Sequence, residues 1–168
     1  SISAPIPRQG QAAQSTQAII TDYIKNGFIH IVPKGLDHIL FVLGLFFYAA
    51  RWQPLLGQVT LFTLAHSLTL FLASTGYIVV SPTVIEPMIA ASIIYIAYEN
   101  IRRQRMNAIR ILVIFVFGLL HGLGFASVLS DIMIGDSMLN AGGFASGQFI
   151  LSLIGFNIGV ELGQLAVL

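Results

Sequence analysis

The sequence contains no cysteine and very few charged residues. The absence of cysteine excludes disulfides, thiolate metal sites and cysteine nucleophiles. Charged residues make up 9% of the 168 residues, whereas an ordinary soluble domain has about 25%. The eight Lys and Arg residues nearly balance the seven Asp and Glu residues, and a net charge of +1 is no signature of nucleic-acid binding. A soluble domain and a nucleic-acid-binding protein are therefore disfavoured from the start.

Apolar residues are what the chain has in excess. They make up 56% of it, and the mean hydropathy is +0.86, which also excludes a disordered chain. A helix needs about 20 mostly apolar residues to cross the hydrocarbon core of a bilayer. The sequence therefore predicts an all-α protein, a polytopic transmembrane helical bundle. Its predicted spans are residues 36–50, 54–74, 82–101, 109–129 and 144–168.

The two ends of the chain differ from these spans. Thr16–Ile31 carries apolar residues at helical spacing among polar ones, which is typical of an amphipathic helix lying on the membrane or against the bundle. Residues 1–15 are expected to form an extended arm, and residues 16–168 a single transmembrane domain. The last apolar run has no polar flank at Leu168, so we expect the chain to be truncated there.

Basic residues indicate the orientation. Arg51 lies in the link between the first two spans. The link between the third and fourth spans carries four arginines, Arg102, Arg103, Arg105 and Arg110. Links rich in Lys and Arg lie in the cytoplasm, so both of these links should be cytoplasmic and the N-terminus outside. Glu99, near the end of the third span, is expected to pair locally with Arg102 or Arg103.

Histidine and aspartate inside the spans are the candidate functional residues, because an ionisable group in a span is costly and by default marks a site. Asp37 and His38 begin the first span, and His66 and His121 lie in the second and fourth. His66 and His121 each lie about 12 residues into a span. At a rise of about 1.5 Å per residue, both lie just beyond the midplane of the bilayer, on its outer side. His and carboxylate ligands suit Zn, Ni, Co or Fe(II). We therefore predict that these four residues bind one divalent transition metal, with His30 at its outer entrance, although hydrogen bonding between helices stays open as an alternative.

The fifth span has two different faces. Gly155, Gly159 and Gly163 recur at every fourth position, a pattern that lets a neighbouring helix approach closely. Asn157 and Glu161 fall on the opposite face, together with Gln164. We predict that Asn157 and Glu161 line a transport path on which the metal moves inward.

Five motifs carry a family resemblance. They are Gly27-Phe-Ile-His30-Ile, Gly35-Leu-Asp37-His38-Ile-Leu-Phe, Thr63-Leu-Ala-His66-Ser67-Leu-Thr69, Phe117-Gly-Leu-Leu-His121-Gly-Leu-Gly-Phe-Ala-Ser127 and Phe156-Asn157-Ile-Gly-Val-Glu161-Leu-Gly-Gln164. Together they resemble the HupE/UreJ family of bacterial membrane proteins, named as hydrogenase and urease accessory proteins. Six residues separate His30 from the Asp37-His38 pair, which is the spacing of the second branch of that family.

The resemblance implies a secondary permease of the bacterial inner membrane that supplies Ni(II) to nickel enzymes. Its metal signature would be His30, Asp37 and His38, with His66 and His121 as further ligands. Zinc and cobalt stay open as the metal, since the same ligands suit them. The chain has no ATP-binding G-x-x-x-x-G-K-[ST] motif, so transport would be facilitated or ion-coupled. Expected partners are the metal ion and the lipid bilayer, with a second copy of the chain or a metalloenzyme maturation protein as further candidates.

Two other classes of protein stay open. An intramembrane zinc-dependent hydrolase would use the His and Asp ligands with an open water position, assisted by Ser67 or Ser127. A non-catalytic accessory subunit would use the histidines only to join helices. A transporter is the leading interpretation, ahead of an enzyme.

Overall fold

Six α-helices make up the part of the chain that the structure describes. The structure is a computed structural model, and it describes residues 16–48, 51–102, 108–135 and 147–168, with the backbone alone at 126–135. These residues contain no strand, so the predicted all-α class is confirmed. The arm expected at residues 1–15 lies outside them. The helices are α1 (Thr16–Ile31), α2 (Leu36–Tyr48), α3 (Trp52–Ser74), α4 (Pro82–Arg102), α5 (Ala108–Gly135) and α6 (Gly147–Val167).

The helices have the length and composition of a multi-pass membrane protein. Four of those described can cross a membrane by themselves, namely α3, α4, α6 and the Ala108–Phe125 part of α5. The short helices α1 and α2 pass the same test as a pair, although the chain bends by 72° between them. How many times the chain crosses the membrane, and in which direction, stay predictions.

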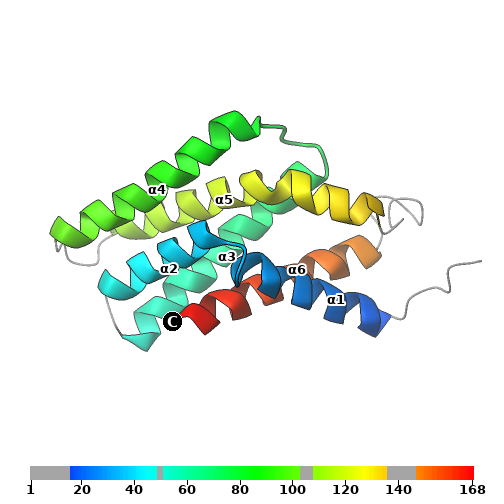
Figure 1. Ribbon diagram of the computed structural model, residues 1–168, viewed down its shortest axis with the longest axis horizontal. Helices are drawn as coiled ribbons and strands as arrows, with labels where there is room; N and C mark the ends of the chain where they lie inside the picture. The colour runs from blue at the N-terminus through cyan, green and yellow to red at the C-terminus, as the bar shows by residue number, and fades with distance from the viewer. Residues whose placement is uncertain (1–15, 49–50, 103–107, 136–146) are drawn as a thin grey trace, which may run out of the picture.

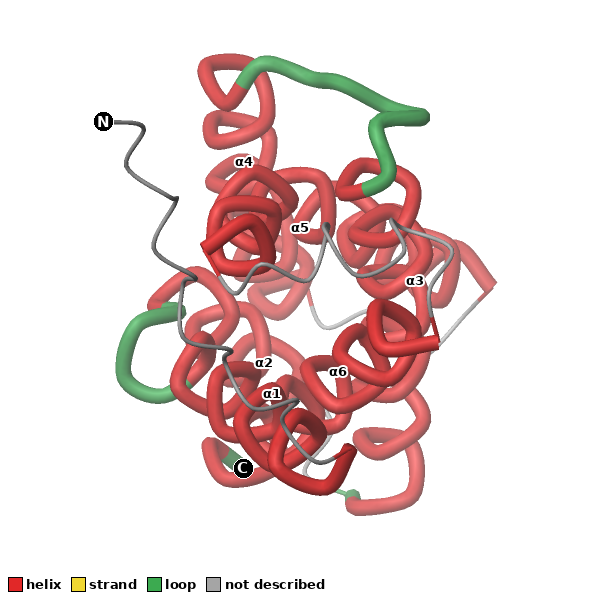
Figure 2. The backbone as a smooth tube through the Cα atoms, turned by 90° about the vertical axis from the view of Figure 1, so that its right-hand side faces the viewer, coloured by secondary structure: helices red, strands yellow, loops and turns green. Residues whose placement is uncertain are grey.

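The helices form one bundle in which two pairs pack most extensively. Figure 1 shows α1 beside α6 and α3 beside α5, and these two pairs also share the most contacts. Seen end on in Figure 2, α4 and α5 lie on one side of the bundle and α1, α2 and α6 on the other. The buried residues of α1 recur at every fourth position, Ile19, Tyr23, Gly27 and Ile31, as expected of an amphipathic helix. That buried face lies against α6.

Glycine permits the close approach of α1 and α6. A Cβ atom added to Gly159 would overlap the backbone carbonyl of Ile24, and one added to Gly27 would overlap that of Phe156. The glycine face that the sequence predicts to pack closely on a neighbour therefore does so, with α1 as the neighbour. Small residues at a helix contact let the two backbones approach in this way.

The apolar side chains form two separate cores. One joins α1 and α6 with parts of α3 and includes Tyr23, Phe156 and Val160. The other lies between α2, α3, α4 and α5, and we call it the apolar layer. It consists of Phe41, Leu45, Leu55, Phe62, Ile96 and Ile114. Two buried polar clusters lie on either side of the apolar layer along these helices.

Candidate metal centre

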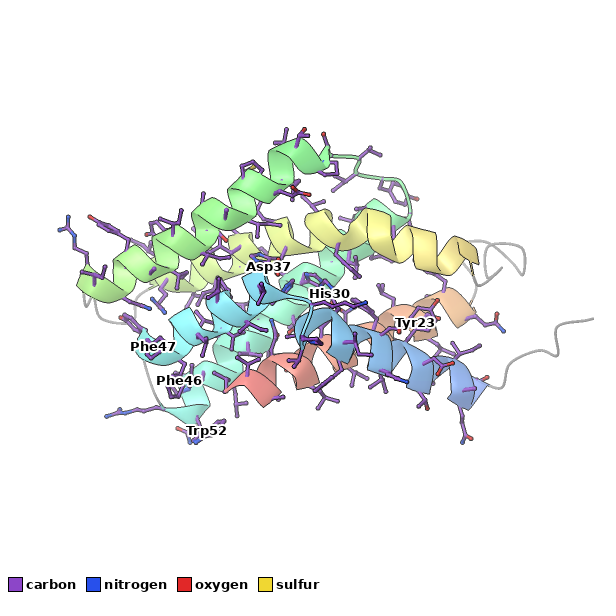
Figure 3. All side chains as sticks on the ribbon, viewed as in Figure 1. Tyr23, His30, Asp37, Phe46, Phe47 and Trp52 are labelled. Atoms are coloured by element: carbon purple, nitrogen blue, oxygen red, sulfur yellow. The ribbon has the colours of Figure 1, made fainter. Side chains whose placement is uncertain are left out.

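A sharp turn between α1 and α2 brings the first polar cluster together. The Gly35 amide donates to the Ile31 carbonyl at 3.0 Å, and the Ile39 amide donates to the Gly35 carbonyl at 2.9 Å, so α2 begins directly where α1 ends. A Cβ atom on Gly35 would lie 2.5 Å from the His30 carbonyl oxygen, so glycine is needed for this approach. The turn places His30, at the end of α1, beside Asp37 at the start of α2, and Figure 3 shows both near the middle of the molecule.

Four histidines from four helices meet at this turn, and we call them the histidine cluster. One ring nitrogen from each of His30, His38 and His66 lies within 4.8 Å of those of the other two. The ring of His121 lies 4.9 Å from that of His38, between ring centroids. His66 has 0% and His38 only 2% of its surface exposed. The cluster is therefore an interior site built from α1, α2, α3 and α5.

Several buried nitrogens of the histidine cluster have no hydrogen-bond partner among the residues that the structure describes. They are Nε2 of His30, His38 and His121, and both Nδ1 and Nε2 of His66. A buried polar atom without a partner is costly, and in hydrocarbon no water is available to provide one. Neutral imidazole nitrogen is a common ligand of divalent transition metals. The arrangement therefore fits a metal ion held by three or four imidazoles.

Two of the histidines are oriented by their second nitrogen. His121 Nδ1 lies 2.7 Å from the Phe117 carbonyl, which can only accept, so Nδ1 donates and Nε2 keeps a lone pair. His38 Nδ1 lies 3.2 Å from Asp37 Oδ1 and donates to that carboxylate in the same way. Histidine ligands of metals in proteins are held by such bonds. The free Nε2 atoms of His38 and His121 therefore have the form that binds a metal.

Aromatic rings surround the histidine cluster. Between ring centroids, His30 lies 3.7 Å from Phe125 and 5.6 Å from Phe156. The centroid of the Phe62 ring lies 5.0 Å from that of His121. Apolar walls exclude water and strengthen the interaction of a bound cation with its ligands. The histidine cluster therefore lies among aromatic side chains, while Asp37, with its side chain 39% exposed, lies at its edge.

The structure places His30 and His121 differently, relative to the centre of the cluster, from what the sequence predicts. His30 was expected at an entrance, yet it belongs to the three closest histidines, whereas His121 lies just outside that group of three. Asp37 contacts His38, so its position suits an orienting acceptor. The reason is the 72° bend, which turns the end of α1 back onto α2 and α3. The short separation of six residues between His30 and the Asp37-His38 pair was the available signal.

Asn157 and Glu161 lie on α6, which packs against α3 as well as α1. The Thr60 hydroxyl donates to Glu161 Oε1 at 2.6 Å, and the Asn157 amide donates to the Leu153 carbonyl at 2.8 Å. One turn along, the Thr63 hydroxyl donates to Gln164 Oε1 at 2.9 Å. Polar side chains therefore follow α3 away from His66. These threonine partners were not identified from the sequence.

The second buried polar cluster was also missed, and we call it the arginine cluster. It consists of Tyr48 from α2, Gln58 from α3, Glu99 from α4 and Arg110 from α5. Arg110 Nη1 donates to Glu99 Oε2 at 2.5 Å, and Arg110 Nε donates to Gln58 Oε1 at 3.3 Å. The guanidinium carbon lies 3.7 Å from the centroid of the Tyr48 ring. Arg110 has 0% of its surface exposed, although the sequence analysis assigned it to the link between two spans.

The predicted pairing of Glu99 with Arg102 is wrong. Glu99 pairs with Arg110 of the next helix, while Arg102 donates to the Tyr98 hydroxyl at 2.9 Å. Arg103, the other predicted partner, lies outside the described residues. The physical reason is that α5 begins at Ala108, so Arg110 enters the bundle as a helical residue and faces the end of α4.

The serines proposed for a hydrolase give no support to that alternative. The Ser67 hydroxyl donates to the Thr63 carbonyl at 2.6 Å, within its own helix. The side chain of Ser127 lies outside what the structure describes.

A protein-family model described as HupE / UreJ protein matches residues 7–168 of the chain. No curated protein and no solved structure matches.

Proposed function

The chain belongs to the HupE/UreJ family, and on that premise we propose that it is a secondary permease for a divalent transition metal, with Ni(II) as its substrate and Co(II) or Zn(II) as competitors. The proposal places it as a single transmembrane domain of five spans in the bacterial inner membrane, with its N-terminus outside. The metal is cargo in this function. It enters the bundle, is held by the histidine cluster and is released on the other side.

The observation that carries the proposal is the set of unpartnered ring nitrogens in the histidine cluster. A cluster that served only to join helices would bond its nitrogens to neighbouring groups. Here both nitrogens of the fully buried His66 lack a partner among the described residues. We therefore assign His66, His30 and His38 as the central ligands and His121 as the fourth.

Asp37 has a different role in the proposal. It accepts a hydrogen bond from His38 Nδ1 and so holds the other nitrogen of that ring toward the metal. It also adds a negative charge near the mouth of the site, which favours the arrival of a cation over that of an anion.

Release of the metal follows α3 in this proposal. Glu161, beside Thr60, and Asn157 provide oxygen ligands that bind a soft-to-borderline ion more weakly than imidazole does. Sites that bind weakly enough to release the ion suit transport. Nickel specificity rests on the family resemblance, because imidazole alone accepts several of these metals.

The decisive experiment is metal binding by the purified full chain. Isothermal titration with Ni(II), Co(II) and Zn(II) should show one principal site, and X-ray absorption at the nickel edge should show nitrogen ligands with the signature of imidazole. Ser81→Ala, at an exposed position of the link before α4, serves as the control. Retention of one tight site in His66→Ala, with an unchanged absorption spectrum, would contradict the assignment.

A further inference from the structure

The arginine cluster holds an ion pair where four helices meet. Glu99 and Arg110 are joined at 2.5 Å, and both are buried. Tyr48 and Gln58 add contacts from α2 and α3. A buried ion pair rarely adds stability over apolar side chains of similar size, because both ions lose their water. The arrangement therefore requires an explanation beyond helix packing.

The position of this ion pair relates it to the histidine cluster. The same four helices that provide Tyr48, Gln58, Glu99 and Arg110 include those of His38, His66 and His121. Along α5, Arg110 lies about 16 Å from His121, at about 1.5 Å per residue. The apolar layer, with Phe41, Phe62 and Ile114, occupies the interval. The two polar clusters therefore lie on one axis of the bundle, separated by packed side chains.

The arginine cluster marks the end of that axis which the predicted orientation places in the cytoplasm. The exposed aromatic side chains of Phe47 and Trp52 lie at the same end of the molecule, as an interfacial belt would. Beyond the apolar layer on this axis, a cation reaches the arginine cluster, in which Glu99 provides the carboxylate. Thr60 and Glu161 lie on another face of α3, where that helix meets α6.

We propose that Glu99 is the inner cation ligand of the permeation route and that Arg110 is its tethered competitor, so that their ion pair closes the inner end while no metal is present there. The proposal rests on the proposed function as a permease. A divalent cation that reaches Glu99 displaces the guanidinium, and the guanidinium re-forms the pair once the cation has left. Two cations cannot share one carboxylate at full strength, so the metal does not stay bound.

The surroundings of Arg110 suit such an exchange. When Glu99 turns to the metal, the guanidinium keeps its hydrogen bond to Gln58 and its position over the Tyr48 ring. A cation over an aromatic face is stabilised by the ring, and most strongly where water is excluded. Arg110 is therefore never left as a bare buried charge. Lysine has neither the planar fork nor the reach to keep both of these contacts.

The test uses the full chain in liposomes, with Ni(II) uptake and Ni(II) binding measured on the same preparations. The double variant E99Q/R110Q removes both charges while retaining the size of the carboxyl side chain and leaving no uncompensated ion. We expect its principal Ni(II) affinity to equal that of the wild type, because the histidine cluster is intact. We expect its uptake rate to fall about tenfold or more, the usual cost of losing a group that serves a metal site.

The single variants distinguish a cation-binding role of Glu99 from a purely structural role in joining α4 to α5. R110Q leaves the carboxylate without its competitor, and a second, weaker Ni(II) site should appear in titration, whereas E99Q should show none. R102Q is the matched control, because Arg102 is an exposed arginine at the end of the same helix that carries Glu99. It should retain wild-type uptake and a single site.

Glu99→Asp serves if the neutral variants do not fold, since it retains both charges and moves the carboxylate by one methylene. A shifted ratio of nickel to cobalt uptake is expected, because the ligand position has changed. An uptake rate in E99Q/R110Q equal to that of the wild type, or an unchanged metal ratio in Glu99→Asp, would overturn the proposal. Failure of the proposed function would look different, because the wild type itself would then bind no metal at the histidine cluster.

Discussion

The histidine cluster and the arginine cluster are both polar, both buried and both built from several helices, yet they differ in how far their polar atoms have partners. In the histidine cluster, buried nitrogens of all four rings lack a partner in the described part of the chain. In the arginine cluster, Arg110 has a carboxylate, an amide oxygen and an aromatic face around it, and the Tyr48 hydroxyl is without a hydrogen-bond partner among the described residues. Burial alone therefore does not identify a binding site. What distinguishes the histidine cluster is that every member has a potential ligand atom without a partner.

The two clusters also differ in what their buried side chains require. A neutral imidazole can be buried at moderate cost without a bound ion, but a charged guanidinium cannot be buried without a counter-ion. We therefore expect mutations in the first cluster to alter metal binding, and mutations in the second to alter stability or transport. Four predictions test this division, in order of decreasing effect.

Arg110→Ala should reduce the free energy of unfolding by about 3–5 kcal/mol, because Glu99 would remain as a buried charge without a partner. Thermal unfolding in detergent, followed by circular dichroism, measures the loss. E99Q/R110A should recover most of it, since no uncompensated ion remains. Equal stability of Arg110→Ala and the wild type would show that the two clusters do not differ in the way described.

His66→Ala should weaken Ni(II) binding by about 100-fold or more, the upper range for groups that serve a metal site. His66 is the buried histidine whose two ring nitrogens both lack a partner among the described residues, so its removal breaks no hydrogen bond there and takes away a metal ligand. Titration calorimetry measures the affinity, and the melting temperature without metal is the internal control. An unfolded variant would assign His66 to packing instead.

Acidification should weaken binding at the histidine cluster by about tenfold or more, but only well below pH 6, because burial disfavours the charged imidazolium form and keeps the rings neutral. Metal binding needs the neutral ring, so affinity is constant near neutral pH and is lost as pH falls further. Ni(II) binding at pH 7 should therefore release almost no protons, which titration in buffers of different ionisation enthalpy measures. Release of one proton or more per ion at pH 7 would show that the empty cluster holds charged rings.

Asp37→Asn should weaken Ni(II) binding by about tenfold, since the amide accepts from His38 Nδ1 less strongly than the carboxylate does. The fold should be unaffected, because the side chain is 39% exposed. Titration of the variant beside Asp22→Asn, an exposed position on α1, gives the comparison. A loss as large as that of His66→Ala would make Asp37 a direct ligand.

The sequence predicts the class of fold and the composition of the histidine cluster, and the reasons are local. Apolar runs of sufficient length dictate helices, and the spacing of Gly155, Gly159 and Gly163 identifies the close contact that α1 occupies. Histidines within apolar runs are conspicuous. These features need only the spacing of residues along one helix.

What the sequence does not predict depends on the relation between helices. Arg110 looks like one more positive charge in a link, and only the start of α5 at Ala108 turns it inward to Glu99. His30 looks peripheral until the bend after α1 brings it to His66. A turn of 72° and the rotation of one helix against the next are tertiary features, which periodicity does not encode.

The packing of α1 on α6 has a consequence for how the protein is made. His30 is carried by the first helix of the structure, but the most extensive contacts of that helix are with the last one, more than 110 residues later in the chain. During synthesis α1 lacks its most extensive partner until α6 has been made. A nascent chain that ends before α6 therefore already carries all four histidines, but without the helix packing that holds His30 against the other three.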